Sequence, residues 1–173
     1  MDGMKPGQKG AAELQPPSKP QMGDVMGQRG KKRMARILIV EDQEGPRECL
    51  ESAVKKILPR YFEEGSKYEV AKWYTQAEEL IRANHYDIVI LDHRMPYSDP
   101  GCTDWTDFEK FCATLENIGY GLISLIRETN PSAIIIGTSS LSPDELGSAP
   151  KPEYMIKKSR DAEAQLEKIF KNI

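Results

Sequence analysis

Two short aliphatic runs, each followed at once by acidic residues, constrain the fold of this chain more than any other feature. Residues 37–40 (Ile-Leu-Ile-Val) precede Glu41 and Asp42, and residues 88–91 (Ile-Val-Ile-Leu) precede Asp92. Uninterrupted apolar runs of this length are typical of strands that are buried on both faces of a parallel sheet. The sequence therefore predicts an α/β protein in which at least two strands end in carboxylates.

Helical patterns separate the predicted strands. Apolar residues recur at helical spacing between positions 50 and 61, and Thr75 and Glu78 have the spacing of a capping box for a helix that runs to about Asn84. Further strands are predicted at 68–74, 133–137 and 153–156, and further helices around 122–126 and 162–173. Alternating strands and helices imply right-handed crossovers, so we expect a doubly wound five-stranded parallel sheet with helices on both faces.

Charge divides the chain into two regions. Residues 1–33 have a net charge of +4, whereas the remaining residues sum to −7, within a total of −3. The first segment is rich in Pro and Gly and poor in branched aliphatic residues, so we predict a disordered basic arm over residues 1–34 and a folded domain over 35–173. The basic cluster at 30–33 could contact nucleic acid, but a solvated tail is the favoured interpretation. A true start of the protein at Met34 also stays open.

The remaining composition favours a cytoplasmic protein without membrane insertion. No apolar stretch approaches the roughly 18 residues that a membrane span needs, and no signal-peptide pattern follows the N-terminus. The three cysteines, Cys49, Cys102 and Cys112, form no CxxC pair. An odd number of unpaired cysteines is typical of reduced thiols, and the absence of a neighbouring His or Cys set argues against zinc.

Polar residues at the ends of the predicted strands indicate the chemistry. Ligands of such sheets bind beyond the carboxyl ends of the strands, which here carry Glu41, Asp42, Asp92, Thr138 and Lys157. Converging carboxylates raise one another's pKa unless a cation lies among them, and a set of oxygen ligands suits Mg²⁺. A hydroxyl and an ammonium group can hold the other oxygens of a phosphoryl group. The residues therefore predict phosphoryl transfer to Asp92 as the nucleophile.

Four motifs in this order resemble the receiver domains of two-component response regulators. They are residues 37–42 (Ile-Leu-Ile-Val-Glu-Asp), 92–96 (Asp-His-Arg-Met-Pro), 138–139 (Thr-Ser) and 154–157 (Tyr-Met-Ile-Lys). The resemblance covers about residues 35–173 and implies a flavodoxin-like (βα)5 fold. It also implies that Asp92 accepts a phosphoryl group from a histidine kinase or a histidine phosphotransfer protein.

The resemblance implies roles for the residues around Asp92. Glu41, Asp42 and Asp92 would hold Mg²⁺ together with the backbone carbonyl of Arg94. Lys157 would pair with the phosphoryl oxygens, Thr138 would move toward the phosphoryl group, and Tyr154 would swing inward with it. The residues whose positions tune dephosphorylation in the family are Arg94 and Ser140.

The chain departs from the family pattern in three places. An insertion at about 97–120 is predicted to contain a helix at 105–116, with Thr106 and Glu109 as a capping box and an apolar stripe packed on the body. Residues 142–152 can form little more than a turn, because Gly147, Pro150 and Pro152 interrupt them. Lys158 stands where a proline commonly follows the lysine of the site.

Signalling through protein contacts is the predicted output, since only residues 159–173 follow the lysine pair at 157–158 and we expect them to leave no room for a fused effector. The chain is accordingly expected to be a signalling protein rather than an enzyme. A hydrolase with an aspartyl-phosphate intermediate is disfavoured, because Arg94 occupies the position of the second acid that such enzymes need.

A receiver-like scaffold that binds its partner without phosphorylation remains the alternative. Asp92 as a simple strand-end cap, Glu41 and Asp42 as helix caps, and Tyr154 as an ordinary aromatic also stay open. The sequence names neither the kinase, the downstream partner nor the oligomeric state.

Overall fold

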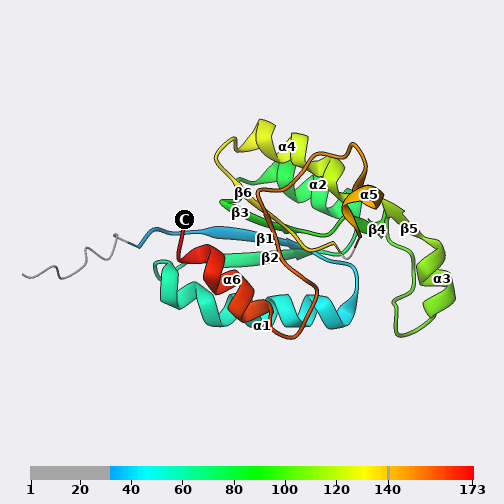
Figure 1. Ribbon diagram of the computed structural model, residues 1–173, viewed down its shortest axis with the longest axis horizontal. Helices are drawn as coiled ribbons and strands as arrows, with labels where there is room; N and C mark the ends of the chain where they lie inside the picture. The colour runs from blue at the N-terminus through cyan, green and yellow to red at the C-terminus, as the bar shows by residue number, and fades with distance from the viewer. Residues whose placement is uncertain (1–31, 140) are drawn as a thin grey trace, which may run out of the picture. The chain divides into compact units, whose positions relative to one another are not determined.

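Five parallel strands form the central sheet, in the order β2-β1-β3-β6-β7 (Figure 1). The computed structural model describes residues 32–139 and 141–173, so the predicted arm lies almost entirely outside the described residues, as does Ser140. The bounds in chain order are β1 (Arg36–Val40), α1 (Glu44–Tyr61), β2 (Lys67–Ala71), α2 (Tyr74–Ala83), β3 (Ile88–Leu91), β4 (Arg94–Pro96), α3 (Phe108–Ala113), β5 (Leu115–Asn117), the 3-10 turn η1 (Gly119–Gly121), α4 (Leu122–Thr129), β6 (Ile134–Gly137), α5 (Pro143–Leu146), β7 (Tyr154–Met155) and α6 (Ala162–Phe170). The predicted doubly wound, flavodoxin-like sheet is confirmed.

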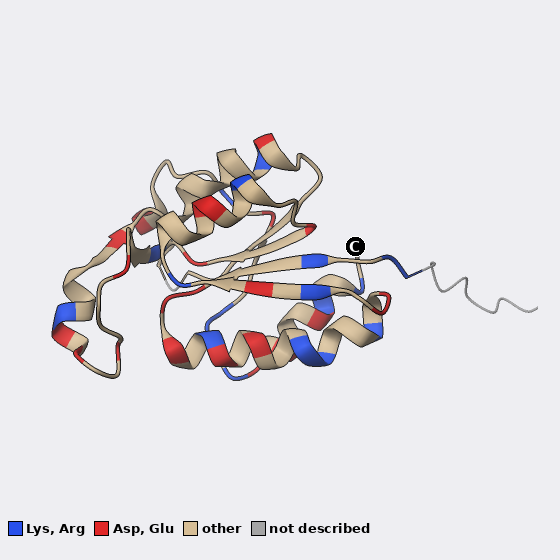
Figure 2. Cartoon of the chain, turned by 180° about the vertical axis from the view of Figure 1, so that it is seen from behind, with Lys and Arg blue, Asp and Glu red and all other residues tan. Residues whose placement is uncertain are grey.

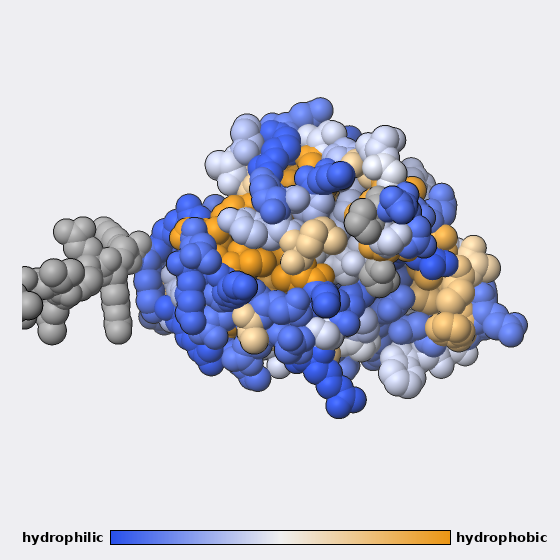
Figure 3. Space-filling model, viewed as in Figure 1, coloured by the Kyte–Doolittle hydropathy of each residue, from blue (hydrophilic) through white to orange (hydrophobic). Residues whose placement is uncertain are grey.

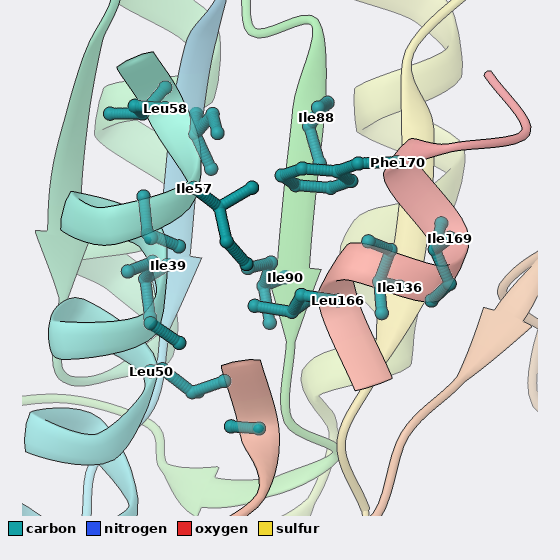
Figure 4. Close-up of a cluster of buried hydrophobic side chains, with 14 of the residues drawn as sticks. Ile39, Leu50, Ile57, Leu58, Ile88, Ile90, Ile136, Leu166, Ile169 and Phe170 are labelled. Carbon is teal, nitrogen blue, oxygen red and sulfur yellow. The ribbon is translucent and has the colours of Figure 1, made fainter. Parts of the chain in front are cut away.

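Helices cover both faces of the sheet, with α1 and α6 on one side and α2 and α4 on the other (Figure 1). Ile37 and Ile39 of β1 face the first layer, while Leu38 and Val40 face the second. Successive side chains of a strand point to opposite faces, so an apolar run without polar interruptions is required where both faces are covered. Figure 4 shows the first layer, in which side chains of α1, α6 and the strands β1, β3 and β6 meet, and the labelled members of this cluster are all buried.

The helix starts are less regular than the sequence predicts. The capping box of Thr75 and Glu78 is wrong, because α2 begins two residues earlier, with Trp73 as an N-cap that makes no side-chain hydrogen bond. Instead the backbone N–H of Thr75 donates to the carbonyl of Tyr97, at 2.9 Å. The insertion thus supplies the acceptor that a capping side chain would otherwise provide.

The insertion is a hairpin extension that the sequence did not predict. Strands β4 and β5 pair antiparallel and close a segment that contains α3. This helix is shorter than predicted, and its N-cap is Asp107, which accepts from the N–H of Lys110 at 3.0 Å, so the prediction of Thr106 as the cap is wrong. Phe111 of the predicted apolar stripe is buried, but Phe108 is 65% exposed, so the prediction that the stripe packs on the body is wrong for Phe108.

The segment after β6 contains only the four-residue helix α5. This confirms the prediction that residues 142–152 form little more than a turn. Within the described part of the chain, no helix has the length and apolar character that crossing a membrane requires.

Candidate functional site

The ends of three neighbouring strands bring the predicted site residues together. The parallel ladder continues one residue past each strand: Glu41 N–H donates to Ala71, Asp92 N–H to Val40 and Thr138 N–H to Leu91, each at 3.0 Å. These bonds fix the backbone of the three residues at the same edge of the sheet. The site therefore lies on a buried, hydrogen-bonded part of the sheet, which limits how far its groups can move apart.

Three carboxylates converge at this edge. One oxygen each from Glu41, Asp42 and Asp92 lies within 4.8 Å of the others, and the residues are 0%, 6% and 1% exposed. Burial, reinforced by the charge of Asp92, raises the pKa of Glu41 to about 8 and that of Asp42 to about 7. The ionised forms of both groups are thus disfavoured when no metal ion shares the site.

Lys158, and not Lys157, is the lysine of the site. Its Nζ donates to Asp92 Oδ2 at 2.6 Å and to Glu41 Oε1 at 3.0 Å. Burial would lower the pKa of Lys158, but the charges of Glu41 and Asp92 outweigh it and raise this pKa. Lys157 is exposed, and its backbone N–H donates to Gln165 Oε1 at 2.8 Å. The prediction of Lys157 is wrong by one residue, because α6 holds the backbone of Lys157 and leaves the next side chain to reach the carboxylates.

This correction shifts the neighbouring positions as well. Tyr154 is partly buried and packs against the α1/α6 cluster, and its predicted inward swing with Thr138 stays a prediction. The residue three positions before Lys158 is Met155, and its Sδ accepts from the hydroxyl of Tyr120 at 3.4 Å. Ser159, rather than Lys158, is the residue that follows the lysine of the site.

Several buried oxygens at this edge have no hydrogen-bond partner among the described residues. They include both carboxylate oxygens of Asp42 and the hydroxyl of Thr138. A buried polar atom without a partner costs free energy, so such atoms are typical of positions where a ligand supplies the missing contact. The carboxylate oxygens suit a cation, and the hydroxyl and ammonium groups suit the oxygens of a phosphoryl group.

Two further residues beside Asp92 were not predicted. The backbone N–H of the buried His93 donates to Asp92 Oδ1 at 2.7 Å, and the ring Nδ1 of His93 accepts from the backbone N–H of Tyr120 at 3.1 Å. Burial lowers the pKa of His93, which favours the neutral ring that this acceptor role requires. Tyr120 is fully buried against this ring, with 4.5 Å between the centroids. Only the adjacency of His93 to Asp92 hinted at this in the sequence.

The structure places Arg94 in the first strand of the hairpin, with its side chain exposed. The pKa of Glu145 in α5 is lowered mainly by hydrogen bonds with Ser142, and the positive charge of Arg94 makes a smaller contribution. The guanidinium is thus near the start of the hairpin and the short helix α5, and the predicted role of the Arg94 carbonyl stays a prediction.

Solved structures with the same architecture were found at low sequence identity. No protein-family model and no curated protein matches the sequence. A CheY-like response regulator receiver domain from Methylobacillus flagellatus is 18% identical, with a TM-score of 0.54 over 80% of this chain and 97% of that chain. A similar domain from Methanospirillum hungatei is 21% identical, with a TM-score of 0.53 over 80% and 92%.

The chain has the receiver-domain fold. A third structure with this fold is the response regulator TrrA from Thermotoga maritima in complex with Mg²⁺ and BeF, which is 22% identical with a TM-score of 0.53 over 81% of this chain and 100% of that chain. In the present chain, the carboxyl ends of the receiver sheet carry the cluster of Glu41, Asp42, Asp92 and Lys158.

Proposed function

We propose that this protein is a signal-transduction receiver that accepts a phosphoryl group on Asp92 and signals through protein contacts. The observation that carries the proposal is the buried contact of Asp92 with one lysine and two further carboxylates at the strand ends of a receiver fold. A strand-end cap would not require two more buried acids and an ammonium group, because burying charges costs free energy unless a function retains them.

The donor of the proposed reaction is a phosphohistidine of a histidine kinase or a histidine phosphotransfer protein. An oxygen of Asp92 attacks the phosphorus, the O–P bond forms, and the N–P bond breaks with its electron pair returning to the imidazole. Lys158 Nζ already contacts Asp92 Oδ2, so it is placed to neutralise the transferred oxygens. The hydroxyl of Thr138, which has no partner among the described residues, donates to the phosphoryl group once it is bound.

The cation in the proposal is Mg²⁺, held by Glu41, Asp42 and Asp92 with the backbone carbonyl of Arg94. When bound, it offsets the negative charge that accumulates on the phosphoryl oxygens. The raised pKa values of Glu41 and Asp42 fit this role, since a cation would stabilise the ionised forms that burial disfavours. Phosphorylation then acts by shifting the population between two arrangements of the surrounding loops, as a new charge is bound better by one of them.

The proposal also keeps the boundaries inferred from the sequence, with a basic arm at 1–34, a receiver at 35–173, and a role for Arg94 and Ser140 in setting the lifetime of the phosphorylated state. The downstream partner is a protein whose identity the fold does not name.

Incubation of the full chain with Mg²⁺ and acetyl phosphate, followed by intact-mass measurement, tests this function. The wild type should gain one phosphoryl group, and both the Asp92→Asn variant and the wild type with excess EDTA should gain none. A gain that survives in Asp92→Asn would assign the acceptor elsewhere. Absence of any gain with acetyl phosphate and with phosphorylated phosphotransfer proteins would favour the alternative, a scaffold that works without phosphorylation.

A further inference from the structure

A pocket of about 450 Å³ opens between the insertion and the carboxylate cluster. Asp42 and Glu44 form part of its wall, and Asp99 and Asp104 of the insertion form another part. Such a pocket has room for several water molecules. The insertion therefore brings two carboxylates of its own to the edge of the sheet where the cation site lies, and this edge would be open without the insertion.

Asp42 supplies an independent observation that points to a ligand in this pocket. It lines the pocket, it is 6% exposed, and neither of its carboxylate oxygens has a hydrogen-bond partner among the described residues. Arg47, which also lines the pocket, donates from Nη1 to the backbone carbonyl of Asp42 at 3.0 Å and not to its carboxylate. The carboxylate oxygens of Asp42 are therefore left for a group that enters from the pocket.

Asp104 is held close to this position by the first helix. The backbone N–H of Glu44, the first residue of α1, lies 3.4 Å from Asp104 Oδ1. The N-cap of α1, Gln43, makes no side-chain hydrogen bond, so the carboxylate of Asp104 occupies the place of a cap at a helix end that favours negative charge. The charge of Asp104 is also one of the causes that raise the pKa of Asp42, after burial and Asp92.

We propose that Asp104 is an outer-shell partner of the divalent cation held by Glu41, Asp42 and Asp92, and that cation binding thereby fixes the insertion against the edge of the sheet. Mg²⁺ keeps several of its waters in protein sites, and carboxylates beyond the direct ligands accept hydrogen bonds from those waters. Asp104 lines the same pocket as Asp42 without belonging to the set of three converging carboxylates, which is the position of such a partner. The inference rests on the proposed function only through its cation site.

The two tryptophans of the chain provide the readout. Trp73 lines the pocket, and Trp105 directly follows Asp104 and is 74% exposed. In a Trp73→Phe background, all tryptophan fluorescence comes from Trp105 of the insertion. A saturable change in this emission on adding Mg²⁺ then reports that the insertion responds to the cation, and calorimetry on the full chain gives the Kd separately.

The decisive comparison is Asp104→Asn against Asp107→Asn. Both remove one negative charge from the insertion, but Asp107 is outside the pocket lining, and Asn still caps α3. Asp104→Asn should raise the Kd for Mg²⁺ by about tenfold and abolish the Trp105 response, as expected for loss of an outer-shell partner. Asp107→Asn should stay within about twofold of the wild type, because exposed charges are screened.

The outcomes separate this inference from the proposed function. If the wild type binds Mg²⁺ and Asp42→Asn does not, but Asp104→Asn and Asp107→Asn have the same Kd, the inference about Asp104 is overturned and the cation site stands. If Mg²⁺ does not bind the wild type at all, the cation site of the proposed function fails, and the inference fails with it.

Discussion

The edge of the sheet and the insertion beside it are both acidic, yet their carboxylates are in opposite physical situations. At the edge, Glu41 and Asp92 are buried and share one lysine. In the insertion, which carries five acids and one lysine between residues 97 and 117, Asp107 is exposed and caps a helix. Figure 2 marks the acidic positions of the chain in red. Buried carboxylates without enough counter-charge create a need for a ligand, whereas exposed ones are satisfied by backbone and water. The position in the fold, rather than the residue type, decides which acids carry chemistry.

Gly119, where the two regions join, should give the largest effect on stability. A Cβ at Gly119 would lie 2.0 Å from the backbone oxygen of Asp92 and 2.6 Å from the Met95 side chain. Because the backbone of the site would have to move, Gly119→Ala should lower the free energy of unfolding by about 4 kcal/mol, beyond the usual cost of overpacking. Urea denaturation measures this. Gly45→Ala is the matched control, since a Cβ there meets nothing within 4 Å, and a loss of stability in the control as large as that of Gly119→Ala would contradict the account.

The second-largest effect is expected in the pH dependence of stability, which should differ between the buried carboxylates of the sheet edge and the exposed ones of the insertion. Burial and neighbouring charge raise the pKa of Asp42 from 3.8 to about 7 and that of Glu41 from 4.5 to about 8. The folded protein therefore holds protons that the unfolded chain releases, so without a cation the free energy of unfolding should fall as pH rises from about 4 to about 8. Asp42→Asn should reduce this fall by about 3 kcal/mol.

Denaturation at pH 5 and pH 8, in EDTA, measures that difference, and Asp107→Asn should leave it unchanged. Saturating Mg²⁺ should also restore stability at pH 8 in the wild type, because it binds the ionised carboxylates. Equal pH profiles for Asp42→Asn and the wild type would contradict the raised pKa of Asp42.

The adjacent lysines allow a third test. Lys158→Met leaves Glu41 and Asp92 without their ammonium partner and should cost about 2 kcal/mol at pH 8, less than for a buried pair that cannot take up a proton. It should also slow phosphorylation by acetyl phosphate. Lys157→Met changes an exposed side chain and should stay within about 0.5 kcal/mol. The reverse ranking of the two variants would restore the prediction made from sequence.

The smallest effect is expected on the insertion surface. Apolar side chains gather over α3 (Figure 3), and Phe108 is 65% exposed while Phe111 is buried. Phe108→Ala should change the free energy of unfolding by less than about 0.5 kcal/mol, whereas Phe111→Ala removes a buried ring and should cost several times more. Thermal denaturation of the two variants is sufficient, and equal losses would show that the insertion buries Phe108 as well.

The parts of the fold that sequence predicts best are those in which burial on both faces leaves no choice. The apolar runs before Glu41 and Asp92 fixed two central strands and, through the geometry of parallel sheets, the convergence of the carboxylates. Lys158 was missed because β7 has only two residues, so its alternation is too short to decide which of two adjacent lysines turns inward. Two hydrogen bonds between the side chain of Gln165 and the backbone of Lys157 decide it, and such a contact between a helix and the loop before it cannot be read from the local pattern.

The hairpin of the insertion escaped prediction for a related reason. Strand β4 contains only Arg94, Met95 and Pro96, and its partner β5 lies about twenty residues later in the chain. Three-residue strands carry almost no periodicity, and a proline argues against a strand. Likewise the start of α2 is held by the carbonyl of Tyr97 and not by a local cap, so a capping-box pattern could only mislead.

Locating the phosphoryl group in the chain tests the central claim most directly. Treating the acetyl-phosphate product with borohydride reduces an aspartyl phosphate to homoserine, which peptide mass spectrometry can place. The account predicts homoserine at position 92 alone, in the presence of Mg²⁺ and not in EDTA. Homoserine at position 42, modification of another residue, or labelling that does not depend on Mg²⁺ would contradict it.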